Sequence, residues 1–195
     1  MKKEKVKPSF SAILMYCIIG VSALIFAVCF ILYYGDIYHK ASVLWTGVTF
    51  FTIAYHLQLR LIMGNVSKLF SVNHKQKWFR EKKFEAKLYR FLNVKVWKGK
   101  ALTYNPELYD IKSRTLTQIA DTTAKSELDH WINIIISLTT LCFALIWGQL
   151  WIFALTAVFA MLFDSQFILI QRYNRPRIIK LINRNKPCKT EALEV

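Results

Sequence analysis

A run of 33 residues without a charged side chain, residues 131–163, constrains this chain more than any other feature. A membrane-crossing helix needs about 20 apolar residues at about 1.5 Å of rise per residue, so the run is too long for one span. It must therefore fold back on itself. Gly148-Gln149 is the expected turn, because Trp147 and Trp151 flank it and indole rings favour the membrane interface. The sequence thus predicts two spans in this region.

Two further uncharged stretches, residues 10–34 and 41–59, precede that run. With 54% hydrophobic and 20% charged residues and a mean hydropathy of +0.28, the chain is too apolar for a soluble domain. We therefore expect an all-α integral membrane protein with four transmembrane helices in two hairpins. The expected units are an N-terminal transmembrane hairpin (1–64), a basic cytoplasmic segment with interfacial helices (65–130), a C-terminal transmembrane hairpin (131–171) and a basic cytoplasmic tail (172–195).

The uneven distribution of positive charge predicts the topology. Four lysines precede the first span, fourteen Lys and Arg residues lie from Lys68 to Lys125, and seven lie from Arg172 to Lys189. The loop between the first two spans contains only Lys40. The positive-inside rule therefore places both termini and the central segment in the cytoplasm. Juxtamembrane residues that attract anionic lipids account for the net charge of +15, so nucleic-acid binding is not expected.

The central segment contains an expected interfacial helix between residues 77 and 92. One side of its helical wheel is apolar and the other is basic, with Phe84, Leu88, Phe91 and Leu92 opposite Lys82, Lys83 and Lys87. Residues 94–100 alternate apolar and basic side chains, which favours an extended or turning segment. Pro106 closes a loop, and no Pro or Gly interrupts a helix expected to start near Ser113 and enter the third span.

Two of the expected helices carry polar stripes. On the helix that enters the third span, the stripe contains Glu127, His130, Asn133, Ser137 and Thr140. On the fourth span, expected from about residue 150 to 170, and its continuation, the stripe contains Gln149, Thr156, Asp164, Gln171 and Asn174. Exposure of either stripe to lipid would be costly. The stripes should therefore meet inside the bundle and line a pocket open to the cytoplasm.

Three residues of these stripes are candidate catalytic residues. His130 is a candidate general base near neutral pH, and Glu127, three residues earlier, is expected to orient its ring. The alternative is an ordinary interfacial histidine. Asp164 is either a buried acid or base beside a substrate hydroxyl or a structural partner of Asn133 or His56. The His, Cys and acidic residues do not recur at metal-ligand spacing, so no metal site is expected.

The segment 171–177, Gln-Arg-Tyr-Asn-Arg-Pro-Arg, carries more positive charge than topology requires. Guanidinium groups fork onto phosphate or carboxylate, so the segment is a candidate substrate-binding site. The alternative is that these arginines only hold lipid phosphates. Pro176 is expected to stop the helix and to present its neighbours at a turn. The candidate binding residues are Gln171, Arg172, Asn174, Arg175 and Arg177.

Three segments together, residues 94–98, 124–132 and 171–178, resemble the glycosyl-4,4'-diaponeurosporenoate acyltransferase family in order and spacing. The resemblance covers residues 78–185. It implies a multi-pass acyltransferase of the bacterial cytoplasmic membrane that esterifies a sugar hydroxyl of a glycolipid, such as a glycosyl carotenoid. The acyl group would come from acyl-CoA or acyl carrier protein as a donor substrate, and no other cofactor is implied.

Mapped onto this reaction, His130 is the expected base, Glu127 its orienting partner, and the arginines contact donor phosphate or sugar. Two other functions stay open from the sequence. One is a non-enzymatic membrane accessory or assembly protein that binds lipid or a protein partner. The other is a transferase of a different reaction type, with the arginines holding a phosphate-bearing donor.

Overall fold

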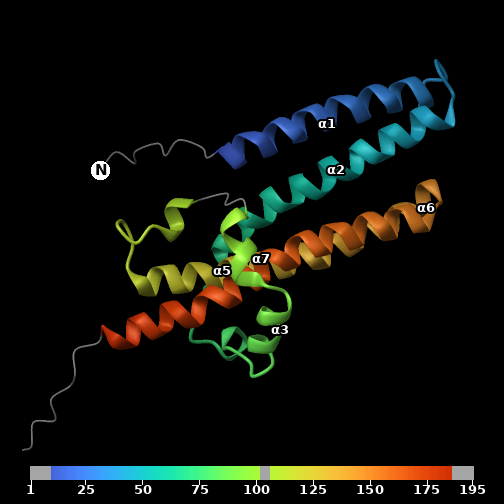
Figure 1. The fold of residues 1–195 in the computed structure, drawn as a ribbon. Coiled ribbons are helices and arrows are strands. Elements are labelled where there is room, and N and C mark those ends of the chain that lie inside the picture. The colour runs from blue at the N-terminus through green and yellow to red at the C-terminus, as the bar shows by residue number, and fades with distance from the viewer. Residues whose placement is uncertain (1–9, 102–105, 186–195) are drawn as a thin grey trace, which may run out of the picture.

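Four long helices form the body of the computed structural model, which describes residues 10–101 and 106–185. They are α1 (Phe10–Tyr34), α2 (Ala41–Val66), α5 (Leu116–Thr139) and α7 (Leu150–Arg184). Figure 1 shows them running side by side, with the shorter helices of the central segment gathered at one end. The regular structure of the described residues is entirely helical, as predicted. The four N-terminal lysines and the last ten residues of the predicted tail lie outside the described residues.

The long helices pair as two hairpins whose turns lie at the same end of the bundle. α5 continues through η5 (Thr140–Phe143) and α6 (Ala144–Trp147), and Gly148 and Gln149 then reverse the chain with φ of 71° and 54°. The predicted turn is confirmed. Trp147 donates a 2.9 Å hydrogen bond to the Tyr34 hydroxyl at the end of α1, which joins the two turns.

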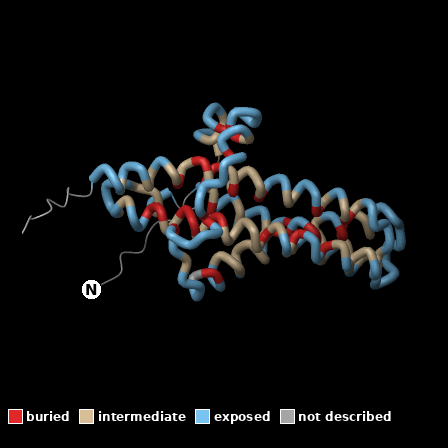
Figure 2. Tube along the Cα trace, turned by 90° about the horizontal axis from the view of Figure 1, so that it is seen from below, coloured by how far each residue is buried: buried red, intermediate tan, exposed pale blue. Residues whose placement is uncertain are grey.

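Three helical segments of the described chain are long and apolar enough to cross a membrane: α1, residues 116–147 and α7. α2 lies alongside α1 but is less apolar, because its second half contains His56, Gln58 and Arg60. The all-helical membrane architecture is therefore supported, and membrane crossing by α2 stays a prediction. Figure 2 shows buried residues concentrated where the helices meet and exposed residues along the outer faces. The exposed apolar side chains of the spans give them a surface suited to lipid, for example Leu24, Ile31 and Phe159.

The central segment differs from its predicted structure. It contains η1 (Ser67–Leu69), η2 (Lys77–Phe79), α3 (Glu85–Phe91), α4 (Val94–Trp97), η3 (Lys98–Lys100) and η4 (Pro106–Tyr109). The helix expected over residues 77–92 is thus only α3, and residues 94–100 are helical turns rather than extended. Asn93, with φ of 48°, separates α3 from α4. A short polar side chain tolerates this left-handed conformation, which allows the chain to redirect there.

α3 also buries a different face from the one expected. Phe91 is 83% exposed, whereas Glu85 and Tyr89, four residues apart, are buried against α7. The Tyr89 ring meets the Tyr173 ring edge-on at 5.4 Å between centroids, and Tyr89 donates a 2.8 Å hydrogen bond to Glu85. Burial, with the hydrogen bond to Glu85, raises the pKa of Tyr89 above its ordinary value. A charged partner on α7, described below, makes burial of Glu85 possible.

α5 begins at Leu116 rather than near Ser113, because Thr115 and Gln118 form a capping box. Gln118 N–H donates to the Thr115 hydroxyl at 3.2 Å, and Thr115 N–H donates to the Gln118 side chain at 3.0 Å. The helix then continues into the third span without a break in the chain direction, as predicted.

Pro176 does not stop the fourth helix. α7 runs through this residue to Arg184. A proline inside a helix leaves the carbonyl four residues earlier without its usual N–H donor, which normally favours a kink or an end. Here the side chains of Arg172 and Arg175 fix α7 to other elements in the turn just before that position. Tertiary contacts therefore override the local signal, and the residues before Pro176 lie on helical faces rather than at a turn.

Candidate functional site

The centre of the bundle contains a buried carboxylate with partners from two neighbouring helices. Asp164, on α7, has no exposed surface. It accepts a 2.9 Å hydrogen bond from Nδ1 of His130 and a 3.4 Å hydrogen bond from Nδ2 of Asn133, both on α5. Arg60, on α2, forms an ion pair with its other oxygen. We call these four residues the Asp164 cluster. Such pairing is what allows a charge to be buried at this depth.

The geometry of His130 suits a general base. An ionised carboxylate only accepts hydrogen bonds, so the proton between Asp164 and His130 belongs to Nδ1 of the ring. In the neutral ring, Nε2 then keeps its lone pair. The ring stacks on Phe167 with centroids 4.8 Å apart and planes within 8° of parallel, and the side chain is 20% exposed. The hydrogen bond to Asp164 therefore fixes the orientation of the ring, while part of the side chain remains exposed.

The expected pair of Glu127 and His130 is wrong. The carboxylate that orients the imidazole is that of Asp164, whereas Glu127 lies between two arginines of α7. Nε of Arg172 donates to Glu127 at 2.7 Å, and the Arg175 guanidinium forms a 2.7 Å charge contact with the second oxygen. Both side chains face α7, as their spacing on α5 predicts. His130 meets an acid of α7, whereas Glu127 meets two cations.

These two arginines are held inside the protein. Arg172 also contacts Glu85 of α3 and donates to the Trp78 carbonyl at 2.8 Å. Arg175, 1% exposed, donates to Thr123 through both its hydroxyl and its carbonyl at 2.9 Å, and to the Phe79 carbonyl at 3.0 Å. We call Glu85, Glu127, Arg172 and Arg175 the arginine clamp, because they fix the central segment to α5 and α7. The guanidinium donors expected for substrate are thus directed at protein groups.

The other three residues of the 171–177 segment point to separate places. Gln171 donates to the Tyr109 hydroxyl at 3.1 Å and to Ser126 at 3.3 Å. Asn174 accepts a 2.7 Å hydrogen bond from Lys98. The Arg177 guanidinium lies 3.5 Å from the centroid of the Tyr173 ring and donates to the Tyr173 carbonyl. The predicted binding segment therefore does not form one surface.

The polar stripes of α5 and α7 meet inside the bundle, as predicted, whereas the pocket expected along them stays a prediction. Ser126 meets Gln171, Glu127 meets the arginines, and His130 and Asn133 meet Asp164. Ser137 and Thr140 are buried farther along but bond to carbonyls of their own helix. Among the described residues, no group of three or more His, Cys, Asp and Glu side chains is placed to hold a metal ion.

Several buried polar atoms around the Asp164 cluster have no hydrogen-bond partner within the described part of the chain. They are Nε of Arg60, Oδ1 of Asn133 and both ring nitrogens of His56. His56 adjoins the cluster, because its carbonyl accepts a 3.0 Å hydrogen bond from Arg60. Buried donors and acceptors of this kind are costly unless a ligand or water satisfies them. The surroundings of Asp164 therefore have hydrogen-bonding capacity for a polar group inside the membrane region.

Arg60 and its role were missed by the sequence analysis. The residue directly follows the second uncharged stretch, residues 41–59. A usable signal was present, since Arg60 is the one cation between Lys40 and Lys68 and follows His56 by a single helical turn.

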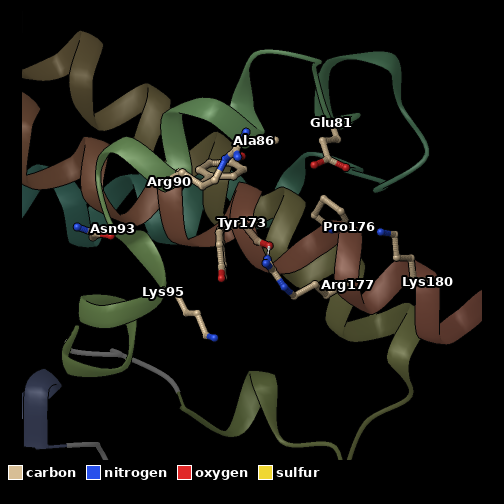
Figure 3. A pocket seen from close by; sticks show the side chains of 10 residues that line it. Glu81, Ala86, Arg90, Asn93, Lys95, Tyr173, Pro176, Arg177 and Lys180 are labelled. Atoms are coloured by element: carbon tan, nitrogen blue, oxygen red, sulfur yellow. Dashed lines mark hydrogen bonds between the residues drawn. The ribbon is translucent and has the colours of Figure 1, made fainter.

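A cavity of about 590 Å³ opens where α3 and α4 pack against the C-terminal half of α7. Figure 3 shows its lining around Tyr173, with Arg90 and Lys95 from the α3–α4 segment and Arg177 and Lys180 from α7. None of the residues of the Asp164 cluster lines it. The two features therefore lie at different depths along α7.

Comparison with known families agrees with this description. The glycosyl-4,4'-diaponeurosporenoate acyltransferase family model matches residues 75–184, more than half of the 195 residues. The match contains the whole arginine clamp and three of the four residues of the Asp164 cluster, with only Arg60 outside it. No curated protein and no solved structure matches the chain. The resemblance expected from the sequence is confirmed, and the chain belongs to the glycosyl-4,4'-diaponeurosporenoate acyltransferase family, a family of acyltransferases.

Proposed function

We propose that this protein transfers a fatty acyl group from a thioester donor to a sugar hydroxyl of a membrane glycolipid, with a glycosyl carotenoid as the first acceptor to test. The family supports acyl transfer and a glycosylated carotenoid substrate. The observation that carries the mechanism is the 2.9 Å hydrogen bond between Nδ1 of His130 and Asp164. It leaves Nε2 of an oriented imidazole available to accept a proton.

In the proposed reaction, Nε2 of His130 removes the proton from the sugar hydroxyl as its oxygen attacks the thioester carbonyl. The tetrahedral intermediate collapses by breaking the carbon–sulfur bond. The departing thiolate takes the proton from the imidazolium, which yields an ester, a free thiol and neutral His130. Asp164 stabilises the transient imidazolium and keeps its ring in the productive tautomer. The proton balance therefore needs no group besides this pair and the substrates.

The acceptor sugar is proposed to bind beside the Asp164 cluster. The unpartnered polar atoms of His56, Arg60 and Asn133 can exchange hydrogen bonds with sugar hydroxyls. The outer faces of the surrounding helices are apolar, which suits the acyl and carotenoid chains of the substrates. In this proposed arrangement, the polar sugar lies beside polar side chains and the apolar chains lie beside apolar helix faces. Both lie within reach of the cytoplasmic side.

The test uses full-length protein in liposomes with radiolabelled acyl-CoA and a glycosyl carotenoid. We expect an esterified product, and His130→Ala should reduce its rate by about 10²- to 10⁴-fold, the usual contribution of a general base. Protein recovery and helix content by circular dichroism should match the unsubstituted protein. No ester with a panel of glycolipid acceptors and both acyl-CoA and acyl carrier protein donors would overturn the proposal.

A further inference from the structure

The cavity beside Tyr173 is a basic site that the proposed mechanism does not use. Its lining contains four cations, Arg90, Lys95, Arg177 and Lys180, and one acid, Glu81. Within the described residues, the side chains of Arg90, Lys95 and Lys180 form no hydrogen bond or ion pair. The arginine clamp, by contrast, is neutralised by two carboxylates. Arg177 donates to the Tyr173 carbonyl, so three of the four cations lack a partner within the described residues.

A further cation beside the cavity adds to its positive charge. Lys98 lies 4.8 Å from the centroid of the Tyr173 ring, close to the cavity wall. Burial, together with the positive charge of Arg177, lowers the pKa of Lys98 from its ordinary value. Two cations therefore repel each other beside the cavity. An anion bound in the cavity would relieve this repulsion, and phosphate groups bind well to arginine and lysine in such surroundings.

The size and position of the cavity fit the nucleotide part of a donor. A volume of about 590 Å³ is within the usual range of small-molecule sites. Arg177 comes thirteen residues after Asp164 on α7, which corresponds to about 20 Å along the helix. The phosphates and the sulfur of an extended coenzyme A are separated by a distance of the same order. A donor with its phosphates at Arg177 could therefore present its thioester near His130.

We infer that this cavity binds the phosphate groups of a coenzyme A thioester, so that the acyl donor is acyl-CoA rather than a carrier without the nucleotide. The inference rests on the proposed acyl transfer and adds the identity of its donor. Tyr173 forms the floor of the site, and the cations of the α3–α4 segment and of α7 hold the phosphates from two sides.

The experiment compares Lys95→Ala/Lys180→Ala with a control, Lys112→Ala/Arg184→Ala, which removes the same charge from exposed residues that do not line the cavity. Full-length protein in nanodiscs without anionic lipid is titrated with free coenzyme A, and transfer is measured with acyl-CoA and acyl-pantetheine. We expect the first variant to weaken coenzyme A binding and raise the KM for acyl-CoA at least about tenfold, with kcat unchanged. Acyl-pantetheine kinetics should be unaffected, and the control should match the unsubstituted protein.

Each result has a distinct meaning. Normal transfer with equal coenzyme A affinity in both variants would overturn the inference and leave the proposed function intact. Coenzyme A binding that depends on Lys95 and Lys180, without transfer, would support the site and contradict the function. If the first variant loses only binding to vesicles of phosphatidylglycerol, the cavity holds a lipid headgroup and the inference fails.

Discussion

Asp164 of α7 and His130 of α5 share a 2.9 Å hydrogen bond in the interior of the bundle. The acid has no exposed surface, while the histidine side chain keeps 20% of its own. One group is thus fixed and the other remains accessible. His130 and Glu127 thus belong to two separate polar clusters, the Asp164 cluster and the arginine clamp, one helical turn apart on α5.

Asp164→Asn should reduce acyl transfer far more than it reduces substrate binding. An amide can accept a hydrogen bond from Nδ1 only if its oxygen faces the ring, and it cannot stabilise an imidazolium as a carboxylate does. We expect kcat to fall by about 10²- to 10³-fold, with a small change in KM. Steady-state kinetics on reconstituted protein check this.

The matched control for that substitution is Glu107→Gln, which removes one negative charge from an exposed residue outside the Asp164 cluster and the arginine clamp. It should leave kcat within about twofold, because typical surface substitutions change stability little. Equal losses of kcat in the two variants would contradict the orienting role of Asp164.

Glu127→Gln should act on stability rather than on chemistry. Glu127 has no exposed surface and lies between Arg172 and Arg175, so the substitution leaves two buried guanidiniums with less negative charge beside them. Breaking a buried ion pair from one side costs about 3–5 kcal/mol. Thermal unfolding in detergent should show a lowered Tm, while the protein that remains folded keeps a kcat near the original value.

The double variant Glu127→Leu/Arg175→Met separates this effect from catalysis. Removing both partners avoids an unpaired buried charge, so it should recover part of the lost Tm. A large loss of kcat in Glu127→Gln with an unchanged Tm would instead assign Glu127 a role in catalysis, as predicted from the sequence.

The sequence predicted the elements that follow from long apolar runs and from strong turn signals. The fold-back at Gly148, the continuous helix entering the third span and the meeting of the α5 and α7 stripes all depend on hydropathy and on helical period. Hydropathy and helical period are properties of short stretches of the sequence. They identify which faces must be buried, and they place Asp164 and His130 on facing helices.

Pairing between polar residues could not be predicted in the same way. Helical spacing puts Glu127 and His130 on one face, but the partner of each depends on how far α7 is shifted along α5. A shift of one turn would change the partner of each. The short helices of the central segment, and the helical path through Pro176, likewise depend on tertiary contacts of Arg172 and Arg175 that no local pattern reveals.

Arg60→Ala should destabilise the bundle and lower activity, because it removes the cation that pairs with Asp164 from α2. A buried carboxylate that loses such a partner costs about 3–5 kcal/mol, partly offset here by the hydrogen bonds from His130 and Asn133. The measurement is Tm for Arg60→Ala, Asp164→Asn and the double variant. The double variant should be more stable than the sum of the single losses predicts, with a coupling of about 1–3 kcal/mol.

Additive losses in that cycle would contradict a direct interaction between α2 and α7. Arg60→Lys is the conservative control, since it keeps a cation but not the fork that also reaches the His56 carbonyl. It should retain more stability than Arg60→Ala and less than the unsubstituted protein.

Crossing of the membrane by α2 predicts that both hairpin turns face away from the cytoplasm. The turns are joined by the hydrogen bond between Trp147 and Tyr34, so they must lie on one side. Single cysteines at Lys40 and Gln149, in a background with the four native cysteines replaced by serine, should react with a membrane-impermeant maleimide in intact cells. A cysteine at Lys112, in the central segment, should react only after permeabilisation, because the basic segment is expected in the cytoplasm. Labelling of Lys112→Cys in intact cells, or protection of Lys40→Cys while Gln149→Cys reacts, would contradict the four-span arrangement.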